Sequence, residues 1–353
     1  MEKFNTITGP RDGETFTATT FLQYIRRSSP HWWSDDQRSS ECSWVFRGQK
    51  NETLSLTPSA ARQTFNDSNK FNTIIEALRT NLEPHDAWQR YREYPIFQDI
   101  ILRYWALASS IEKFKRLAGE LEYNTTSAQA IHYQIEQWIG GTSIHKSESQ
   151  RNIGFSKVSS SLLRGTLGTY TKVDYRKDPA VALAQHHGIP TFLLDWTSNP
   201  IVAGFFAAQR DAKPEDASGL AIWAFNIGAF QRPSTRHNIN KNPAHPSSIG
   251  ILYPPKATDK YLSSQSGILT YIENPELRWL KNGQYPPMES IIELYSDDLT
   301  EEPFLRKVIL PVAEISKFRQ LLYREGITRA HMMPTLDNIA STAMDVLSNE
   351  CQT

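Results

Sequence analysis

The sequence has little cysteine, no excess of charge of either sign and no long apolar run. Cys42 and Cys351 are the only two thiols in 353 residues, which excludes a disulfide framework and a thiolate metal site. Lys plus Arg number 38, as do Asp plus Glu, so overall charge does not draw the chain toward nucleic acid. No apolar stretch approaches the roughly 18 residues of a membrane helix.

Several common functional motifs are missing as well. The chain has no glycine-rich dinucleotide fingerprint, no phosphate loop ending in Gly-Lys-Ser/Thr and no Gly-x-Ser-x-Gly elbow. Its first residues, Met-Glu-Lys-Phe-Asn-Thr, contain no apolar core of a secretion signal. We therefore expect a cytoplasmic protein that has no membrane partner and uses none of these common active sites.

Strand-like and helical patterns alternate along the chain. A helix is expected over 18–27, capped by Thr17, and a mainly helical region over 69–138. That region carries an apolar stripe at three- and four-residue spacing, made of Phe97, Ile101, Tyr104, Ala108, Ile111 and Phe114. Strands are expected at 44–47, 191–196, 219–225, 249–254, 266–272 and 306–312, and helices at 178–187, 200–209, 315–325 and 340–347. Residues 140–175 have the composition of a long connection, and the whole order predicts an α+β fold.

An arginine stands at the end of the first of these strands, in Trp44-Val45-Phe46-Arg47-Gly48-Gln49. Strand alternation turns Arg47 away from the face that carries Trp44 and Phe46. Gly48 is expected to let the backbone turn and approach whatever Arg47 holds. A guanidinium so placed suits a phosphate or a carboxylate, although a solvated surface arginine has the same local pattern.

Three further motifs follow in order. They are Leu56-Thr57-Pro58-Ser59-Ala60-Ala61-Arg62, the segment Ala-Leu-Ala-Gln-His-His-Gly-Ile-Pro-Thr-Phe-Leu-Leu-Asp-Trp-Thr at 182–197, and Gln265-Ser266-Gly267. Together with Phe46-Arg47-Gly48 they resemble the FRG domain, a bacterial and phage family named for its N-terminal Phe/Tyr-Arg-Gly. The long segment at 182–197 makes the resemblance specific. The resemblance extends from roughly residue 17 to residue 340.

The resemblance implies a distant relationship to the ADP-ribosyltransferases, whose core is a split β-sheet, here with a large α-helical insertion. Residues 1–64 would form the first part of this core, 65–140 the helical insertion, and 141–353 the remainder with a C-terminal β–α unit. It also implies NAD as a substrate, no metal, and a role as a toxin or anti-phage effector with an antitoxin partner.

The first motif of such transferases binds one end of NAD. By resemblance, Phe46-Arg47-Gly48 would bind NAD: Arg47 would grip a phosphate or ribose, and the backbone of Gly48 would meet the nicotinamide amide. In the second motif Thr197 and Ser198 would brace the first strand. Phe205 or Phe206 would then supply a ring against nicotinamide.

At the third motif of the transferases this chain departs from their pattern. Transferases place a Glu or Gln there, then one residue, then the catalytic glutamate, whereas this chain has Gln265-Ser266-Gly267. Gln265 can meet the ribose hydroxyls but supplies no negative charge. The carboxylate would have to come from elsewhere, with Asp195 the first candidate and Glu289 or Glu293 the next.

His186 has two interpretations. It could hydrogen-bond Asp195 and act as a general base, and the apolar neighbourhood of Trp196 would raise the pKa of Asp195. Alternatively Gln185, His186, Asp195 and Trp196 form a buried polar network that fixes the sheet. Adjacent histidines on a helix diverge, so the His186–His187 pair does not indicate a metal site.

The acceptor of the ADP-ribosyl group would be a protein or a nucleic acid. No acidic residue occurs between Asp216 and Asp259, while Arg232, Arg236, Lys241 and Lys256 do, which slightly favours phosphate contacts with nucleic acid. Two alternatives remain: an NAD glycohydrolase, in which water is the nucleophile, and a non-catalytic module that binds a nucleotide or nucleic acid.

Overall fold

A computed structural model describes residues 4–33, 42–62, 70–84, 86–89, 91–120, 179–209, 218–231, 248–253, 267–296, 304–333 and 335–350. The strands are β1 (Asn5–Ile7), β2 (Trp44–Gln49), β3 (Leu194–Thr197), β4 (Gly219–Asn226), β5 (Ser248–Leu252), β6 (Gly267–Glu273) and β7 (Leu305–Pro311). The helices are α1 (Ala18–Ile25), α2 (Lys70–Leu82), α3 (Asp86–Gln89), α4 (Pro95–Glu120), α8 (Pro179–His186), α9 (Pro200–Ala208), α10 (Ile227–Gln231), α13 (Glu276–Asn282), α14 (Met288–Ser296), α15 (Ile315–Arg324), α16 (Arg329–Met332) and α17 (Leu336–Glu350). Short 3-10 turns lie at η1 (Pro30–Trp32), η2 (Ser59–Ala61) and η7 (Val312–Glu314).

The chain forms two compact units. The first contains Met1–Leu56, Asp195–Thr270 and Met288–Thr353, and the second contains Thr57–Leu194 and Tyr271–Pro287. The sequence-based boundaries at 64 and 140 stay a prediction, because they concern the likeness to a transferase core rather than this division.

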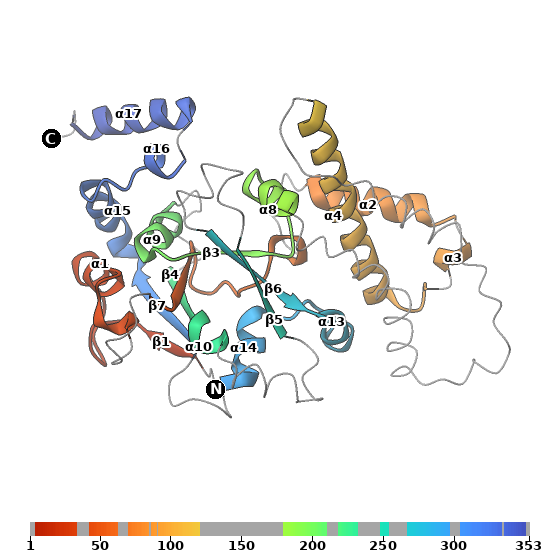
Figure 1. Cartoon of the computed structure of the whole chain (residues 1–353), viewed down its shortest axis with the longest axis horizontal. Helices are drawn as coiled ribbons and strands as arrows, with labels where there is room; N and C mark the ends of the chain where they lie inside the picture. The colour runs from red at the N-terminus through yellow and green to blue at the C-terminus, as the bar shows by residue number, and fades with distance from the viewer. Residues whose placement is uncertain are drawn as a thin grey trace. The chain divides into compact units, whose positions relative to one another are not determined.

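The described strands form a seven-stranded sheet in the order β1-β7-β4-β2-β3-β6-β5. Figure 1 labels these strands except β2. Strand β4 pairs antiparallel with both β2 and β7, and β1 pairs parallel with β7. With helices packed against this sheet, the predicted α+β class is confirmed. In register, Arg47 on β2 lies opposite Trp223 on β4, and Trp223 lies opposite Lys307 on β7.

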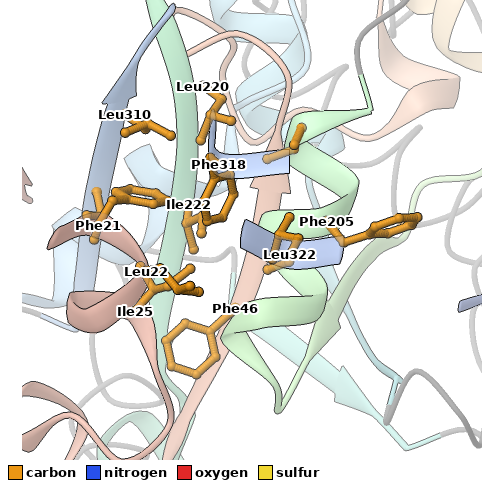
Figure 2. Packing of buried hydrophobic residues seen from close by; sticks show 14 of the residues in the cluster. Phe21, Leu22, Ile25, Phe46, Phe205, Leu220, Ile222, Leu310, Phe318 and Leu322 are labelled. Carbon is orange, nitrogen blue, oxygen red and sulfur yellow. The ribbon is translucent and has the colours of Figure 1, made fainter. Parts of the chain in front are cut away.

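One face of the sheet forms the core of the first unit against α1, α9 and α15 (Figure 2). Phe46, Ile222 and Leu310 come from three neighbouring strands and are completely buried. Phe21 on α1 meets Phe318 on α15 with ring centroids 5.2 Å apart. Burial of each such side chain contributes about 1.5–3 kcal/mol, so this layer holds the sheet and three helices together.

A glycine determines how closely α9 approaches the sheet. A Cβ atom added to Gly48 would lie 2.0 Å from the carbonyl oxygen of Ala203 and 2.8 Å from the backbone nitrogen of Ala207. The strand does not turn at Gly48; it continues through Gln49, and Gly48 pairs with Ile222. The prediction that Gly48 turns the backbone was therefore wrong. Glycine is needed there because a side chain would occupy the space of helix α9.

We expect Gly48→Ala to destabilise the fold strongly. The atoms it would strike belong to helix backbone and cannot rotate away, so the loss should reach or exceed the about 1–3 kcal/mol typical of overpacking. Urea denaturation of the purified variant measures it. Gly119→Ala in α4 is the matched control, since nothing lies within 4 Å of its added Cβ, and it should be neutral or slightly stabilising.

A buried carboxylate fixes the start of β4. Glu52 accepts hydrogen bonds from the backbone N–H of Ser218 (3.1 Å), from the Ser218 hydroxyl and from the backbone N–H of Gly219 (2.8 Å). Burial raises the pKa of Glu52, but the hydrogen bonds together lower it by more. The pKa of Glu52 therefore lies below its ordinary value. The ionised form therefore stabilises the folded state.

The contribution of Glu52 should depend on pH. Because its pKa is lowered by folding, its stabilisation is complete above the unfolded value of about 4.3 and disappears as pH falls through the folded value. At neutral pH Glu52→Gln should lower the unfolding free energy by about 1.5–3 kcal/mol. Urea titrations at decreasing pH should show the gap to the parent closing. Glu14→Gln at an exposed position should show neither effect, and a gap that stayed constant would contradict the assignment.

The second unit has its own aromatic core. The ring of Phe192 lies 4.8 Å from Tyr104, 5.6 Å from Tyr285 and 6.1 Å from Trp279. The Tyr104 hydroxyl also donates to Glu276, which is buried at the start of α13, at 2.6 Å. Four of the six residues in the predicted stripe on α4 are buried, namely Phe97, Ile101, Ala108 and Ile111.

Most predicted elements are present with small shifts. The helix capped by Thr17 ends at Ile25, and the predicted closing helix extends over all of α17. The strand predicted at 191–196 begins only at Leu194, because the Thr191 hydroxyl accepts the backbone N–H of Leu193 (3.1 Å) and turns the chain there. The predicted connection at 140–175 and the helical prediction beyond 120 lie outside the described residues.

Candidate functional site

Arg47 lies on the sheet face opposite to the core of the first unit, as the alternation predicted. Phe46, its neighbour, points the other way, with its ring centroid 4.9 Å from Trp32. The Phe46 ring is completely buried, which leaves only its backbone for a ligand. The Arg47 side chain is 17% exposed, so its guanidinium reaches solvent over a small area.

The guanidinium of Arg47 meets Asp195. Its Nη1 donates to the backbone carbonyl of Asp195 at 2.8 Å and lies 3.7 Å from the Asp195 carboxylate. Burial lowers the pKa of Arg47 and the Asp195 charge raises it, but an arginine remains cationic at neutral pH. Within the described residues Nε of Arg47 has no hydrogen-bond partner although it is buried. One donor of the fork is therefore unused.

Asp195 is the exposed member of this pair. Its side chain is 62% exposed, so the predicted apolar enclosure beside Trp196 does not form around it. Trp196 is buried, and its indole N–H donates to the Thr270 hydroxyl at 2.7 Å. The structure thus separates the two neighbours: Trp196 anchors the strand and Asp195 faces water.

The residues matched to the second transferase motif, Thr197 and Ser198, lie at the turn into α9. The buried Thr197 hydroxyl accepts the backbone N–H of Asn199 at 3.1 Å, and the Asn199 side chain caps α9 by accepting the N–H of Ile201 at 3.0 Å. Ser198 is half-buried beside them. Of the two phenylalanines proposed for nicotinamide, Phe205 is buried in the core and Phe206 keeps part of its ring at the surface.

The remaining predicted residues are not brought together with Arg47 by any described contact. Gln265 lies outside the described residues, as do the basic residues of the acid-free stretch between Asp216 and Asp259, namely Arg232, Arg236, Lys241 and Lys256. His186 ends α8 in the second unit, with its ring 5.4 Å from that of His187. Glu289 is half-buried, and its desolvation raises its pKa; it accepts the Leu56 backbone N–H at 2.9 Å. Glu293 is half-buried on the same helix, α14.

Sequence reasoning missed the polar row beside Arg47. Trp223, its register partner, donates its indole N–H to Gln49 at 2.8 Å, and Gln49 donates to the carbonyl of Ser55 at 3.0 Å. The ammonium of Lys307 lies 4.9 Å from the centre of the Trp223 ring, a cation–π contact. The alternation that assigned Arg47 to this face would also have placed Gln49 there.

The segment at 56–62 and the segment at 182–197 meet in the second unit through Ser59, Ala60 and Thr191. The Ser59 hydroxyl accepts the backbone N–H of Thr191 at 3.1 Å, and the Ala60 N–H donates to the Thr191 carbonyl at 3.0 Å. The Thr191 hydroxyl donates to the side chain of Gln185. Buried Arg103 donates to Asp99 and to the carbonyl of Ala60, both at 2.9 Å. These side chains brace the second unit. Of the expected network only Gln185 takes part in these bonds, and a network of Gln185, His186, Asp195 and Trp196 stays a prediction.

A family model described as "FRG domain" matches residues 103–216. The expected likeness to the FRG domain is therefore confirmed over these residues. The match begins at Arg103 and includes the whole segment at 182–197 with Asp195. The other three motifs, Phe46-Arg47-Gly48, the segment at 56–62 and Gln265-Ser266-Gly267, lie outside it. Neither the curated proteins nor the solved structures yield a match.

Within the described residues, no three His, Cys, Asp or Glu side chains gather in a way that could hold a metal ion. None of the described helices combines the length and apolar character needed to cross a bilayer.

We predict that the motif residues of the FRG domain around Thr191 contribute to stability. Thr191→Val leaves the side chain of Gln185 and the buried N–H of Leu193 without their partner, which should cost about 1–3 kcal/mol. Thermal and urea denaturation measure the loss. Thr80→Val on exposed α2 is the control and should change stability by less than about 0.5 kcal/mol. An undiminished stability of Thr191→Val would contradict the bracing role.

Proposed function

We propose that the chain is an NAD-dependent ADP-ribosyltransferase whose substrate site is built around Arg47 and Asp195. The observation that carries this proposal is the position of the pair, where a mostly buried cation stands beside an exposed carboxylate. The pair joins the two strands that open the first and second motifs of the resemblance.

The pairing of these strands supports a split sheet. Within the described residues β2 and β3 pair only at Phe46 and Thr197. Beside this pair the Arg47 guanidinium, rather than a further ladder bond, reaches the Asp195 carbonyl. The resemblance implies a split β-sheet core, and the short pairing of β2 with β3 beside Arg47 supports that part of the proposal.

Arg47 suits the pyrophosphate of NAD. A guanidinium offers a rigid fork of donors to phosphate oxygens and stays charged in a partly buried position. Its unused Nε–H is one such donor. A phosphate would compete with the present bond to the Asp195 carbonyl, which is a neutral and weaker acceptor.

Asp195 would supply the negative charge that Gly267 cannot. In the transfer, the bond between C1′ of the ribose and the nicotinamide nitrogen breaks, and its electron pair leaves with neutral nicotinamide. The acceptor oxygen or nitrogen forms a bond to C1′ and gives up its proton to a base. A carboxylate beside C1′ stabilises the positive charge that develops there, and Asp195 is exposed enough to meet it.

A second candidate is a non-catalytic module that holds a nucleotide through Arg47. It is favoured by Gly267, which stands at the start of β6 where transferases carry the catalytic glutamate. If water replaced the acceptor, the same site would make the chain an NAD glycohydrolase. The toxin or anti-phage role, a protein or nucleic-acid acceptor, an antitoxin partner and action in the cytoplasm complete the proposal as the resemblance implies them.

The test is incubation of the purified chain with NAD labelled in its adenylate half, together with total protein and RNA from a bacterial lysate. We expect label on a macromolecule and release of nicotinamide. Arg47→Ala should lower kcat/KM about 10- to 100-fold through loss of a charged hydrogen bond, and Asp195→Asn should mainly lower kcat. The control is Arg26→Ala, which removes a surface arginine paired with Glu325.

The outcomes separate the candidates. Undiminished turnover in Arg47→Ala would refute the site, provided that the variant keeps the parent's unfolding midpoint. Saturable binding of ADP-ribose, lost in Arg47→Ala and accompanied by no nicotinamide release, would establish the binding module instead. Nicotinamide release without labelled acceptor would identify a glycohydrolase.

A further inference from the structure

The guanidinium of Arg47 already binds groups of the chain itself. Its Nη1 donates to the Asp195 carbonyl at 2.8 Å, and the Asp195 carboxylate lies 3.7 Å from the same nitrogen. The buried Nε–H has no hydrogen-bond partner among the described residues. A phosphate that binds Arg47 therefore arrives at a cation with a carboxylate beside it, and the ligand meets two charges of opposite sign.

Asp195 is held in this position by the residues that follow it. The indole N–H of buried Trp196 donates to the Thr270 hydroxyl at 2.7 Å. Thr197 pairs with Phe46 in the sheet. Because these contacts fix the backbone of β3, a ligand can rotate the Asp195 side chain but cannot remove its charge from the neighbourhood of the guanidinium.

This pair of charges limits what a further negative charge on the ligand can gain. Two like charges about 5 Å apart in water change a binding constant about fourfold, and more where water is partly excluded. An additional negative charge on a ligand is attracted by Arg47 and repelled by Asp195, and the two effects have similar size and opposite sign. The site therefore favours a phosphate that fits the remaining donor and does not favour a higher total charge.

We propose that Asp195 makes the site selective for esterified diphosphates, such as those of NAD and ADP-ribose, over diphosphates that end in a free phosphate. At neutral pH a free terminal phosphate carries more negative charge than an esterified one, since its second pKa is about 6. An arginine without Asp195 would favour the more highly charged ligand. Nucleoside diphosphates and triphosphates would consequently compete poorly with NAD. The inference rests on the proposed binding of pyrophosphate by Arg47, and it is independent of transfer and hydrolysis.

Two ligands that differ only at the terminal phosphate test the proposal. ADP-ribose and ADP share adenosine and a diphosphate, and only in ADP-ribose is the terminal phosphate esterified. Calorimetric titration of the purified full chain, with EDTA at about pH 7.5, gives a dissociation constant for each ligand. We expect the parent to bind ADP-ribose at least as tightly as ADP. Arg47→Ala should weaken the binding of both ligands about tenfold or more.

Asp195→Asn supplies the decisive comparison. It keeps the size of the side chain but removes its charge, so the ratio of the two dissociation constants should shift toward ADP about fourfold, mainly through tighter ADP binding. Added salt should shrink this shift. The side chain is 62% exposed, so the variant should keep the parent's unfolding midpoint.

Glu14→Gln is the matched control. It removes the same charge from a partly exposed carboxylate whose described ion pair is with Arg11. The ratio of the two dissociation constants should stay that of the parent, because the change in net charge alone does not alter the surroundings of Arg47.

The outcomes separate this inference from the proposed function. An unchanged ratio in Asp195→Asn, or weaker ADP binding by that variant, would overturn the selectivity and leave Arg47 as the group that binds phosphate. Binding of both ligands that survives Arg47→Ala, or no binding by the parent, would overturn both proposals. The expected shift together with no release of nicotinamide from NAD would support the selectivity and exclude the transferase.

Discussion

The contact on which the first unit depends is the approach of α9 to β2 at Gly48. With the Ala203 carbonyl where a side chain would begin, the helix backbone lies directly on the central strand. Helix α9 starts immediately after β3, capped by Asn199, so its position also fixes the end of β3 beside Phe46. That in turn brings Asp195 to Arg47. The close approach of α9 at Gly48 therefore sets the geometry of the candidate site.

The polar residues of the FRG motifs divide into two groups by what they contact. Ser59, Thr191 and Arg103 use their side chains on backbone and on one another, inside a compact unit. Asp195 faces solvent, and Arg47, mostly buried beside it, keeps an Nε–H donor without a partner among the described residues. A motif residue can thus be needed for folding or for binding, and burial with a full set of partners distinguishes the first from the second.

Local signals gave most of the elements. Thr17 as a cap, Pro200 at the first turn of α9 and the alternation around Arg47 act within a few residues, and each is visible in the sequence. Contacts between distant segments could not be read in this way. The sequence does not reveal that Gly48 meets Ala203, or that Asp195 rather than Trp196 faces water, because both follow from tertiary packing. Strand β1 was missed for another reason: its three residues are too few to show an alternating pattern.

Orientation is the property of α17 that sequence pattern alone could not supply. Its periodicity predicts an amphipathic helix, and the usual inference is that the apolar side faces inward. Only the hydrogen bonds of Asn338 and Thr342 show that the polar side is attached, which reverses the inference. The free energy that burial of Leu336, Ile339 and Met344 would provide is therefore not used within the described part of the first unit.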